Sequence, residues 1–207
     1  MYCNVCGNNA FGAFSGRMHA LCQKCKSTER HRLLVRALFN SGIDLTKIDA
    51  SKILMLNGNE ELNQKLKNFF LGNTLVEKSV SFPISLTSLA DGYDLILHSH
   101  FLNNVNCDWR VLLNLLILKL NPSGKMFFTV PVDVAKASND SDRGVSNIDY
   151  GELKEVGQGT INKDIKLDHL AEYLRGLDGK FLHLKYPERE LLEISAIGVD
   201  VFSFVKY

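Results

Sequence analysis

Four of the five cysteines stand near the start of the chain, in two pairs whose spacing suits metal ligands. The pairs are Cys3-x-x-Cys6 and Cys22-x-x-Cys25, with 15 residues between them. A tetrahedral zinc ion takes four soft ligands, and two tight turns that face each other can each present two thiolates. Gly7 allows the backbone to curl after the first pair. The spacing therefore predicts a four-cysteine zinc site, against the alternatives of redox-active pairs or unliganded thiols.

The residues between and after the cysteines must bring the two pairs together. The 15-residue spacer is long enough for a short hairpin, and metal binding would supply folding energy that so short a segment lacks. A charged run, residues 29–32, follows Cys25 at once. Ser27 or Thr28 can cap a helix there, because apolar residues recur with helical spacing until Asn40, Ser41 and Gly42.

This helix has two interpretations. In the first, it links a zinc ribbon at residues 1–28 to the rest of the chain, and Glu29, Arg30 and Arg32 pair with groups across the junction. In the second, the charged run is the solvated face of a basic helix. We expect the linking segment to extend over residues 29–50 and a larger unit to occupy residues 51–207.

Composition places the chain among ordinary globular proteins. Of the 207 residues, 45% are hydrophobic and 23% are charged, and a formal net charge of +1 gives no bias toward nucleic acid or membranes. No apolar run approaches the roughly 20 residues of a membrane span, and the first residues do not resemble a secretory signal. We therefore expect a cytoplasmic protein, in which paired cysteines are more often metal ligands than disulfides. Cys107 stands alone and is expected to be a small buried residue.

The rest of the chain alternates between apolar strands and amphipathic helices. This alternation predicts an α/β fold with a parallel sheet covered by helices on both faces. A polar, glycine-rich stretch over 135–165 reads as a long loop, and a short connection over 187–197 leads to a final strand that should pair antiparallel with the one before it. The expected strands are 52–56, 74–76, 93–97, 125–130, 180–186 and 199–206, and the expected helices are 60–70, 108–120 and 166–177.

Several stretches carry more specific patterns. The run "SxERHR" follows the second cysteine pair, "YDLILHSHFLNNV" covers 93–105, "LNPSGKMFFTVPVD" covers 120–133, and "VGQG" covers 156–159. Taken in this order with the CxxC pairs, they resemble bacterial class I S-adenosylmethionine-dependent methyltransferases that carry an N-terminal zinc ribbon and are often encoded near sugar or polysaccharide genes. The resemblance implies a Rossmann-like class I methyltransferase sheet, mostly parallel with the last strand antiparallel.

The resemblance also implies where S-adenosylmethionine would bind. Doubly wound sheets hold their ligands at the carboxyl ends of the strands. A turn after the first strand, an acidic residue after the second and the end of the fourth family strand would hold the cofactor. These positions correspond to Asn57, Gly58, Asn59, Glu77, His98, Ser99 and His100.

Three departures from the family pattern touch this pocket. Lys78 stands beside Glu77 at the position of the ribose-binding acid. Serines replace a clear acid after the third strand, and Asn103 and Asn104 stand where the family has Glu and His. These departures motivate an alternative, a catalytically degenerate methyltransferase-like binding or scaffold protein.

The implied chemistry is methyl transfer to a small or sugar-like acceptor. The protein would hold donor and acceptor at near-attack distance, with His100 or Asp133 as a general base if the acceptor is a hydroxyl. Asp133, Gly157 and Gln158 would lie on the substrate side. A zinc-ribbon nucleic-acid binder is a third hypothesis, disfavoured because the net charge is near zero and no aromatic residues are interleaved with the basic run.

Overall fold

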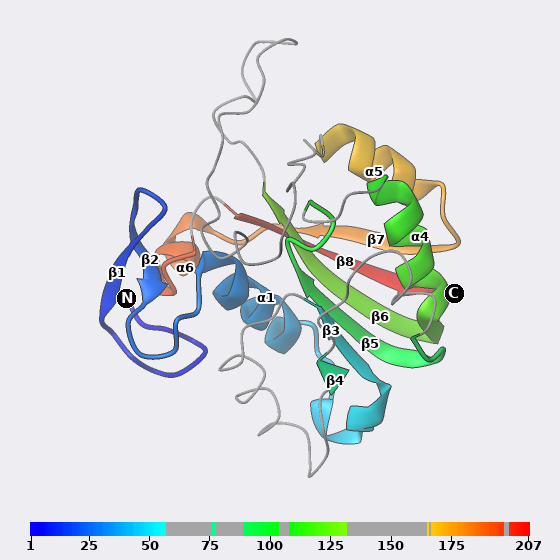
Figure 1. Ribbon diagram of the computed structural model, residues 1–207, viewed down its shortest axis with the longest axis horizontal. Helices are drawn as coiled ribbons and strands as arrows, with labels where there is room; N and C mark the ends of the chain where they lie inside the picture. Colours follow the sequence, from blue (N-terminus) through cyan, green and yellow to red (C-terminus); the bar gives the residue numbers. More distant parts are fainter. Residues whose placement is uncertain (57–75, 78–88, 104–107, 132–164, 166, 197–198) are drawn as a thin grey trace.

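The computed structural model describes residues 1–56, 76–77, 89–103, 108–131, 165, 167–196 and 199–207 (Figure 1). The chain begins with a hairpin of β1 (Phe11–Phe14) and β2 (Arg17–Cys22), which pair antiparallel. Helix α1 (Glu29–Asn40) follows and lies between this hairpin and the main sheet. Within the described part of the chain, no helix combines the length and the apolar character that crossing a membrane requires.

The main sheet has six strands in the order β4-β3-β5-β6-β8-β7. Strands β3, β4, β5 and β6 pair in parallel, whereas β8 runs antiparallel to both of its neighbours, β6 and β7. This arrangement confirms the predicted mostly parallel α/β sheet with an antiparallel last strand. The strands are β3 (Ile53–Leu56), β4 (Val76–Glu77), β5 (Tyr93–Ser99), β6 (Leu120–Pro131), β7 (Gly179–Leu184) and β8 (Val199–Lys206).

The central strands bury both faces, which explains why their sequences are apolar runs without alternation. On one face, Met55, Leu97 and Phe127 pack in a cluster with apolar residues of α1 and with Cys3 and Cys22. On the other face, the neighbouring strand residues pack against α4 (Trp109–Lys119) and α5 (Leu167–Arg175). Residues 1–28, which we call the cysteine module, therefore share a core with the sheet through α1.

Two elements differ from the expectation. Strand β6 begins at Leu120 rather than after Gly124, and its pairing with β5 shifts register between Tyr93 and Leu95. Ser123 takes a positive φ of 65° inside this irregular start, so the turn signals produce an irregularity in the strand rather than a break before it. The connection after Pro187 contains a short helix, α6 (Glu188–Glu193), because Glu and Leu favour helix; Pro187 stands at its N-cap position without a capping hydrogen bond.

The other expected elements are found close to their predicted bounds, except where the structure gives no description. Short 3₁₀ turns at Leu45–Lys47 and Ala50–Lys52 connect α1 to β3. The expected helix over 60–70 and the expected loop, apart from Ile165, lie outside the described residues. Cys107 also lies outside them.

Candidate functional site

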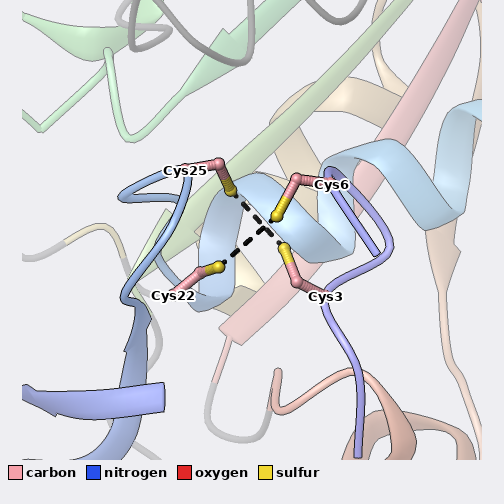
Figure 2. A group of neighbouring side chains, drawn as sticks. All are labelled: Cys3, Cys6, Cys22 and Cys25. Carbon is pink, nitrogen blue, oxygen red and sulfur yellow. Dashed lines mark hydrogen bonds between the residues drawn. The ribbon is translucent and has the colours of Figure 1, made fainter. Parts of the chain in front are cut away.

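The four predicted metal ligands come together at the open end of the hairpin, opposite its turn. Their sulfur atoms all lie within 4.8 Å of one another, and the Cys3–Cys25 and Cys6–Cys22 sulfur pairs are each 3.6 Å apart (Figure 2). A tetrahedron of thiolates about 2.3 Å from a zinc ion has edges of about 3.8 Å, whereas a disulfide needs about 2.05 Å. All four cysteines are free thiols. The cluster therefore fits a tetrahedral metal ion.

Two tight turns of the same design present the four sulfurs. In the first, the Gly7 N–H donates to the Cys3 carbonyl over 2.7 Å; in the second, the Lys26 N–H donates to the Cys22 carbonyl over 2.9 Å. Both Gly7 and Lys26 have positive φ, 77° and 53°. Only the first turn places a glycine at this position, so the second accepts a left-handed lysine at some cost in backbone strain.

Ser27 supports the sulfurs from behind. Its hydroxyl lies 3.2 Å from the Cys3 sulfur and 3.1 Å from the Cys25 sulfur. The pKa of Cys3 is lowered to about 4, chiefly because Cys25 hydrogen-bonds to its sulfur, with Ser27 adding to the effect against the opposing cost of burial. The same contact raises the pKa of Cys25, and burial raises the pKa of Cys6, so Cys3 is the sulfur that these surroundings favour as a thiolate.

The charged run after the cysteines is buried rather than solvated. Glu29, Arg30, His31 and Arg32 are each 9% exposed or less. Thr28 caps α1, and its N–H donates to His31 Nδ1 over 3.2 Å, so the histidine takes the place of the Glu or Gln of a usual capping box. Glu29 pairs with Arg17 of the hairpin at 2.7 Å. The solvated-helix interpretation is therefore wrong.

Arg32 crosses the junction that the first interpretation predicted. Its guanidinium donates to the carbonyls of Ser27 and Ala20 beside the cysteines, over 2.6 and 2.9 Å. It also donates to the carbonyls of Ile194 and Ser195, just before β8; the Ile194 contact spans 2.6 Å. The ring of Phe11 lies under it at 4.9 Å. Arg32 is fully buried, and burial lowers its pKa.

A second polar cluster lies at the carboxyl ends of the parallel strands. His98 of β5 pairs in register with Leu56, the last residue of β3, and with Phe128 of β6. Ser99 pairs in the next rung with Thr129. The strand order reverses between β3 and β5, since β4 lies beyond β3 and the later strands lie beyond β5. Doubly wound sheets bind ligands at such a switch point.

Three side chains at this edge lack hydrogen-bond partners among the described residues. The ring nitrogens of His98 and the hydroxyls of Ser99 and Thr129 are buried at 0% exposure, and none of these atoms is bonded. An unsatisfied buried polar atom costs about 1–3 kcal/mol. Because adjacent strand residues point to opposite faces, Ser99 and Thr129 lie on the α1 side, whereas His98 stacks on Phe128 on the other side.

Burial keeps both histidines at this edge neutral. Desolvation lowers the pKa of His98 to about 3. The pKa of His100 lies well below its usual value, first because of burial and then because of the positive charges of Arg30, His31 and Arg17. His100 follows the end of β5 with a φ of 53°, so the strand alternation that would place it beside His98 stops before it. Its surroundings include the first turn of α1.

The other predicted site residues are only partly described. Glu77 stands at the end of β4, in register with Met55, so its backbone lies at the expected edge. Asn103 is buried. Positions outside the described residues are those of the predicted turn, strand end and loop: Asn57, Gly58, Asn59, Lys78, Asn104, Asp133, Gly157 and Gln158.

Two residues that belong to these polar clusters, Thr129 and Ser27, were not predicted as site residues from the sequence. Thr129 was read only as part of an apolar strand, although a hydroxyl inside the run Met126–Val130 is the signal that could have singled it out. Ser27 was read as a possible helix cap, and its contact with the sulfurs depends on the folded turn. Neither role follows from spacing alone.

No family model matches the chain, and no curated protein matches it. Among solved structures, phosphoethanolamine N-methyltransferase 2 from Haemonchus contortus, in complex with S-adenosyl-L-methionine, aligns over 86% of this chain at 13% identity and a TM-score of 0.47. This chain spans only 37% of that protein's length.

Two further solved structures are similar at the same level. A methyltransferase from Mesorhizobium loti, described as dependent on S-adenosylmethionine, aligns over 83% of this chain and 96% of its own at 11% identity, with a TM-score of 0.47. Human N-acetylserotonin methyltransferase aligns over 86% of this chain and 55% of its own at 14% identity, with a TM-score of 0.46.

Proposed function

We propose that this protein is a cytoplasmic methyltransferase that transfers a methyl group from S-adenosylmethionine to a small or sugar-like acceptor, with a structural Zn²⁺ held by Cys3, Cys6, Cys22 and Cys25. The observation that carries the proposal is the set of unpartnered, fully buried polar groups toward the carboxyl ends of β5 and β6, beside the switch point of the sheet: His98, Ser99 and Thr129. Native proteins keep few such groups, and each has a reason such as a catalytic role or a bound water, ion or ligand. The resemblance of the strand segments to methyltransferases agrees with this position.

The zinc ion has a structural role in this proposal. Four thiolates complete a tetrahedral shell and leave no open position for a substrate. Residues 1–28, 29–50 and 51–207 then form the zinc ribbon, the linking segment and the methyltransferase-like unit. Because Cys3 and Cys22 belong to the same buried cluster as Leu33 and Leu97, the ribbon is a part of the core rather than an appendage.

The bound cofactor would supply an electrophilic methyl group. In the proposed site, Asn57, Gly58, Asn59 and Glu77 hold it from the ends of β3 and β4. Ser99 and Thr129 offer hydrogen bonds from the α1 side of β5 and β6, and His98 offers them from the other side of β5. The chain's contribution to the reaction is to orient the two reactants and exclude water.

The general base is assigned within the same proposal. A pKa far below neutrality makes His100 a weak base, since proton-transfer efficiency is greatest when the pKa of the base lies near the working pH. We therefore propose that Asp133 is the base that removes the proton of a hydroxyl acceptor, and that His100 acts only through hydrogen bonds. Gly157 and Gln158 remain the proposed substrate-side residues of the loop.

Calorimetric titration with S-adenosylhomocysteine tests the proposal. We expect binding to the wild type and to Ser203→Ala, which removes a buried hydroxyl elsewhere on the α1 side of the sheet, and weaker binding to Ser99→Ala. No heat with the wild type at high micromolar ligand would contradict the proposal. Zinc is tested separately by elemental analysis, with one ion per chain expected.

One observation favours a second function, the degenerate scaffold. His98 and Ser99 are fully buried and His100 is 5% exposed, so the strand end is covered by protein. If the covering is permanent, the fold serves as a binding module without turnover. Failure of Ser99→Ala and Thr129→Val to change any ligand affinity, in a protein that contains zinc, would favour this function over the first. The third hypothesis, a nucleic-acid binder, has less support at the basic run, since Arg30 and Arg32 are buried and Arg36 pairs with Glu190 at 2.5 Å.

A further inference from the structure

Arg32 is a fully buried cation whose hydrogen bonds all go to neutral groups. Its four donated bonds end on the backbone carbonyls of Ala20, Ser27, Ile194 and Ser195. A buried charge is tolerated only when an opposite charge or a metal compensates it. The nearby carboxylate, Glu29, is already paired with Arg17. The carbonyls accept four hydrogen bonds from Arg32 but carry no net charge, so among the described residues the charge of Arg32 is stabilised by Glu29, by the cysteine sulfurs and by the ring of Phe11.

The cysteine cluster supplies further negative charge when it holds a metal ion. Four thiolates around one divalent ion carry a formal charge of about −2. Cys3, Cys22 and Cys25 are among the groups whose negative charge stabilises the charged form of Arg32. The guanidinium reaches the cluster through its neighbours, because Ser27 accepts from Arg32 with its carbonyl and contacts the Cys3 and Cys25 sulfurs with its hydroxyl.

The same guanidinium holds the segment that leads into β8. Besides the bonds from Arg32 to Ile194 and Ser195, the Ser195 hydroxyl donates to the His19 carbonyl over 2.6 Å. The Tyr2 N–H donates to the Glu193 carbonyl over 2.7 Å. Figure 1 shows α6 and the start of β8 beside the cysteine module. Residues 193–195 thus depend on the module for their position, and β8 pairs with both β6 and β7.

We propose that Arg32 is the counter-ion of the metal–tetrathiolate centre and transmits metal occupancy to the final strand pair of the sheet. With the metal bound, the negative centre and the four carbonyls fix the guanidinium. Without the metal, the cluster takes up protons and keeps less than the charge of four thiolates, so the buried guanidinium is less well compensated, and residues 193–196 and 199–201 loosen. This inference rests on the proposed metal centre but does not depend on methyl transfer.

Three variants of the zinc-loaded, full-length protein separate charge from geometry. Arg32→Lys keeps the charge but loses the planar fork that reaches four carbonyls. Arg32→Met removes both. Arg36→Met is the matched control, because it removes an arginine one turn further along α1 whose partner is the partly exposed Glu190 carboxylate. The readouts are zinc affinity by chelator competition and amide hydrogen exchange of peptides covering 190–206.

We expect Arg32→Met to weaken zinc binding by about 10- to 100-fold, as outer-shell partners of metal ligands do, and to speed exchange over 193–201. Arg32→Lys should keep most of the zinc affinity yet speed exchange over the same residues. Arg36→Met should change neither quantity. Removal of zinc from the wild type should speed exchange over 193–201 as Arg32→Met does with zinc bound.

Two results would overturn the inference. Equal zinc affinity of Arg32→Met and Arg36→Met removes the counter-ion role, and unchanged exchange over 193–201 after zinc removal removes the coupling. If Arg32→Met does not fold, Arg32→Gln takes its place as the variant without the charge, and the zinc-free wild type still decides the coupling. A wild type that binds no zinc defeats the proposed metal centre itself, an outcome distinct from either of these.

Discussion

The molecule contains two buried polar clusters that differ in how well their groups are satisfied. Around Arg32, four of the five N–H groups of the guanidinium donate to backbone carbonyls, and these bonds connect the cysteine module to the residues before β8. At the carboxyl ends of β5 and β6, His98, Ser99 and Thr129 are just as deeply buried, but their polar atoms have no partners within the described chain.

The difference separates a structural site from a candidate ligand site. A satisfied buried network specifies one packing and stabilises the fold, whereas unsatisfied groups cost free energy in the protein alone. Evolution tolerates such a cost mainly at functional sites. The comparison therefore predicts opposite results from mutation: removing a group from the first cluster should destabilise, and removing one from the second should stabilise the ligand-free protein.

The largest effect should come from the metal ligands. Cys22→Ala leaves three thiols, and the free energy of structural zinc binding, about 10–16 kcal/mol in zinc-finger peptides, exceeds the stability of many whole domains. We expect the variant to lose zinc and its cooperative unfolding transition, measured by elemental analysis and calorimetry. A zinc-free Cys22→Ala that melts like the wild type would show that the first cluster is not structural.

Lowering the pH should reduce the free energy of unfolding because His98 of the second cluster is buried in its neutral form. The folded-state pKa of His98 is about 3, below the unfolded value near 6.5, so the unfolded state binds the proton first as pH falls. The stability present above pH 6.5 is then lost toward pH 3, at about 1.4 kcal/mol per pH unit for one group. His98→Phe should lower that slope by this amount. Urea unfolding at a series of pH values measures it, and equal slopes would mean that His98 is solvated.

A substitution of Thr129 should change stability and ligand affinity in opposite directions. Thr129→Val keeps the shape and removes an unsatisfied hydroxyl, so we expect the ligand-free protein to gain about 1 kcal/mol. The same change should lower the affinity for S-adenosylhomocysteine about tenfold if the hydroxyl binds this ligand. Ser203→Ala serves as the control, since Ser203 is buried in β8 but is not among the unsatisfied groups. Loss of stability in Thr129→Val would contradict the assignment of an unpartnered hydroxyl.

The smallest effect should come from the rim of the first cluster. Glu190 pairs with Arg36, but both side chains are about one-third exposed, so Glu190→Gln should cost less than about 1 kcal/mol. Glu29→Gln should cost more, because Glu29 is 8% exposed where it meets Arg17. Chemical denaturation of the two variants side by side tests the order, and a larger loss in Glu190→Gln would reverse it.

The sequence was most informative where local spacing decides the structure. Two CxxC pairs predicted the cysteine cluster because two thiols per tight turn are fixed by short-range geometry. Apolar runs bounded by turn residues predicted the strands and their alternation with helices, and hence the α/β sheet. The expectation that residues 29–32 begin a helix was also confirmed, since Thr28 and the apolar spacing after it are local signals.

Long-range contacts account for what the sequence left undecided. The sequence could not choose between a solvated charged helix and a buried junction, because the partners of Arg32 lie 162 and 163 residues away at Ile194 and Ser195. The sequence predicts a strand over 125–130, after the turn residues Asn121 to Gly124, yet pairing with β5 begins already at Leu120. Strand alternation would place His98 and His100 on the same face of the sheet, but β5 ends at Ser99 and His100 has a left-handed backbone.

By itself, then, the sequence determined the metal-binding pattern, the order of the strands along the chain and their apolar character, since each depends on neighbours within a few residues. Only the tertiary structure decided which polar groups are satisfied. Whether Arg32 finds carbonyls and Thr129 finds none depends on which distant segments share a face of the sheet, and the free energy of a buried polar group is set by those partners.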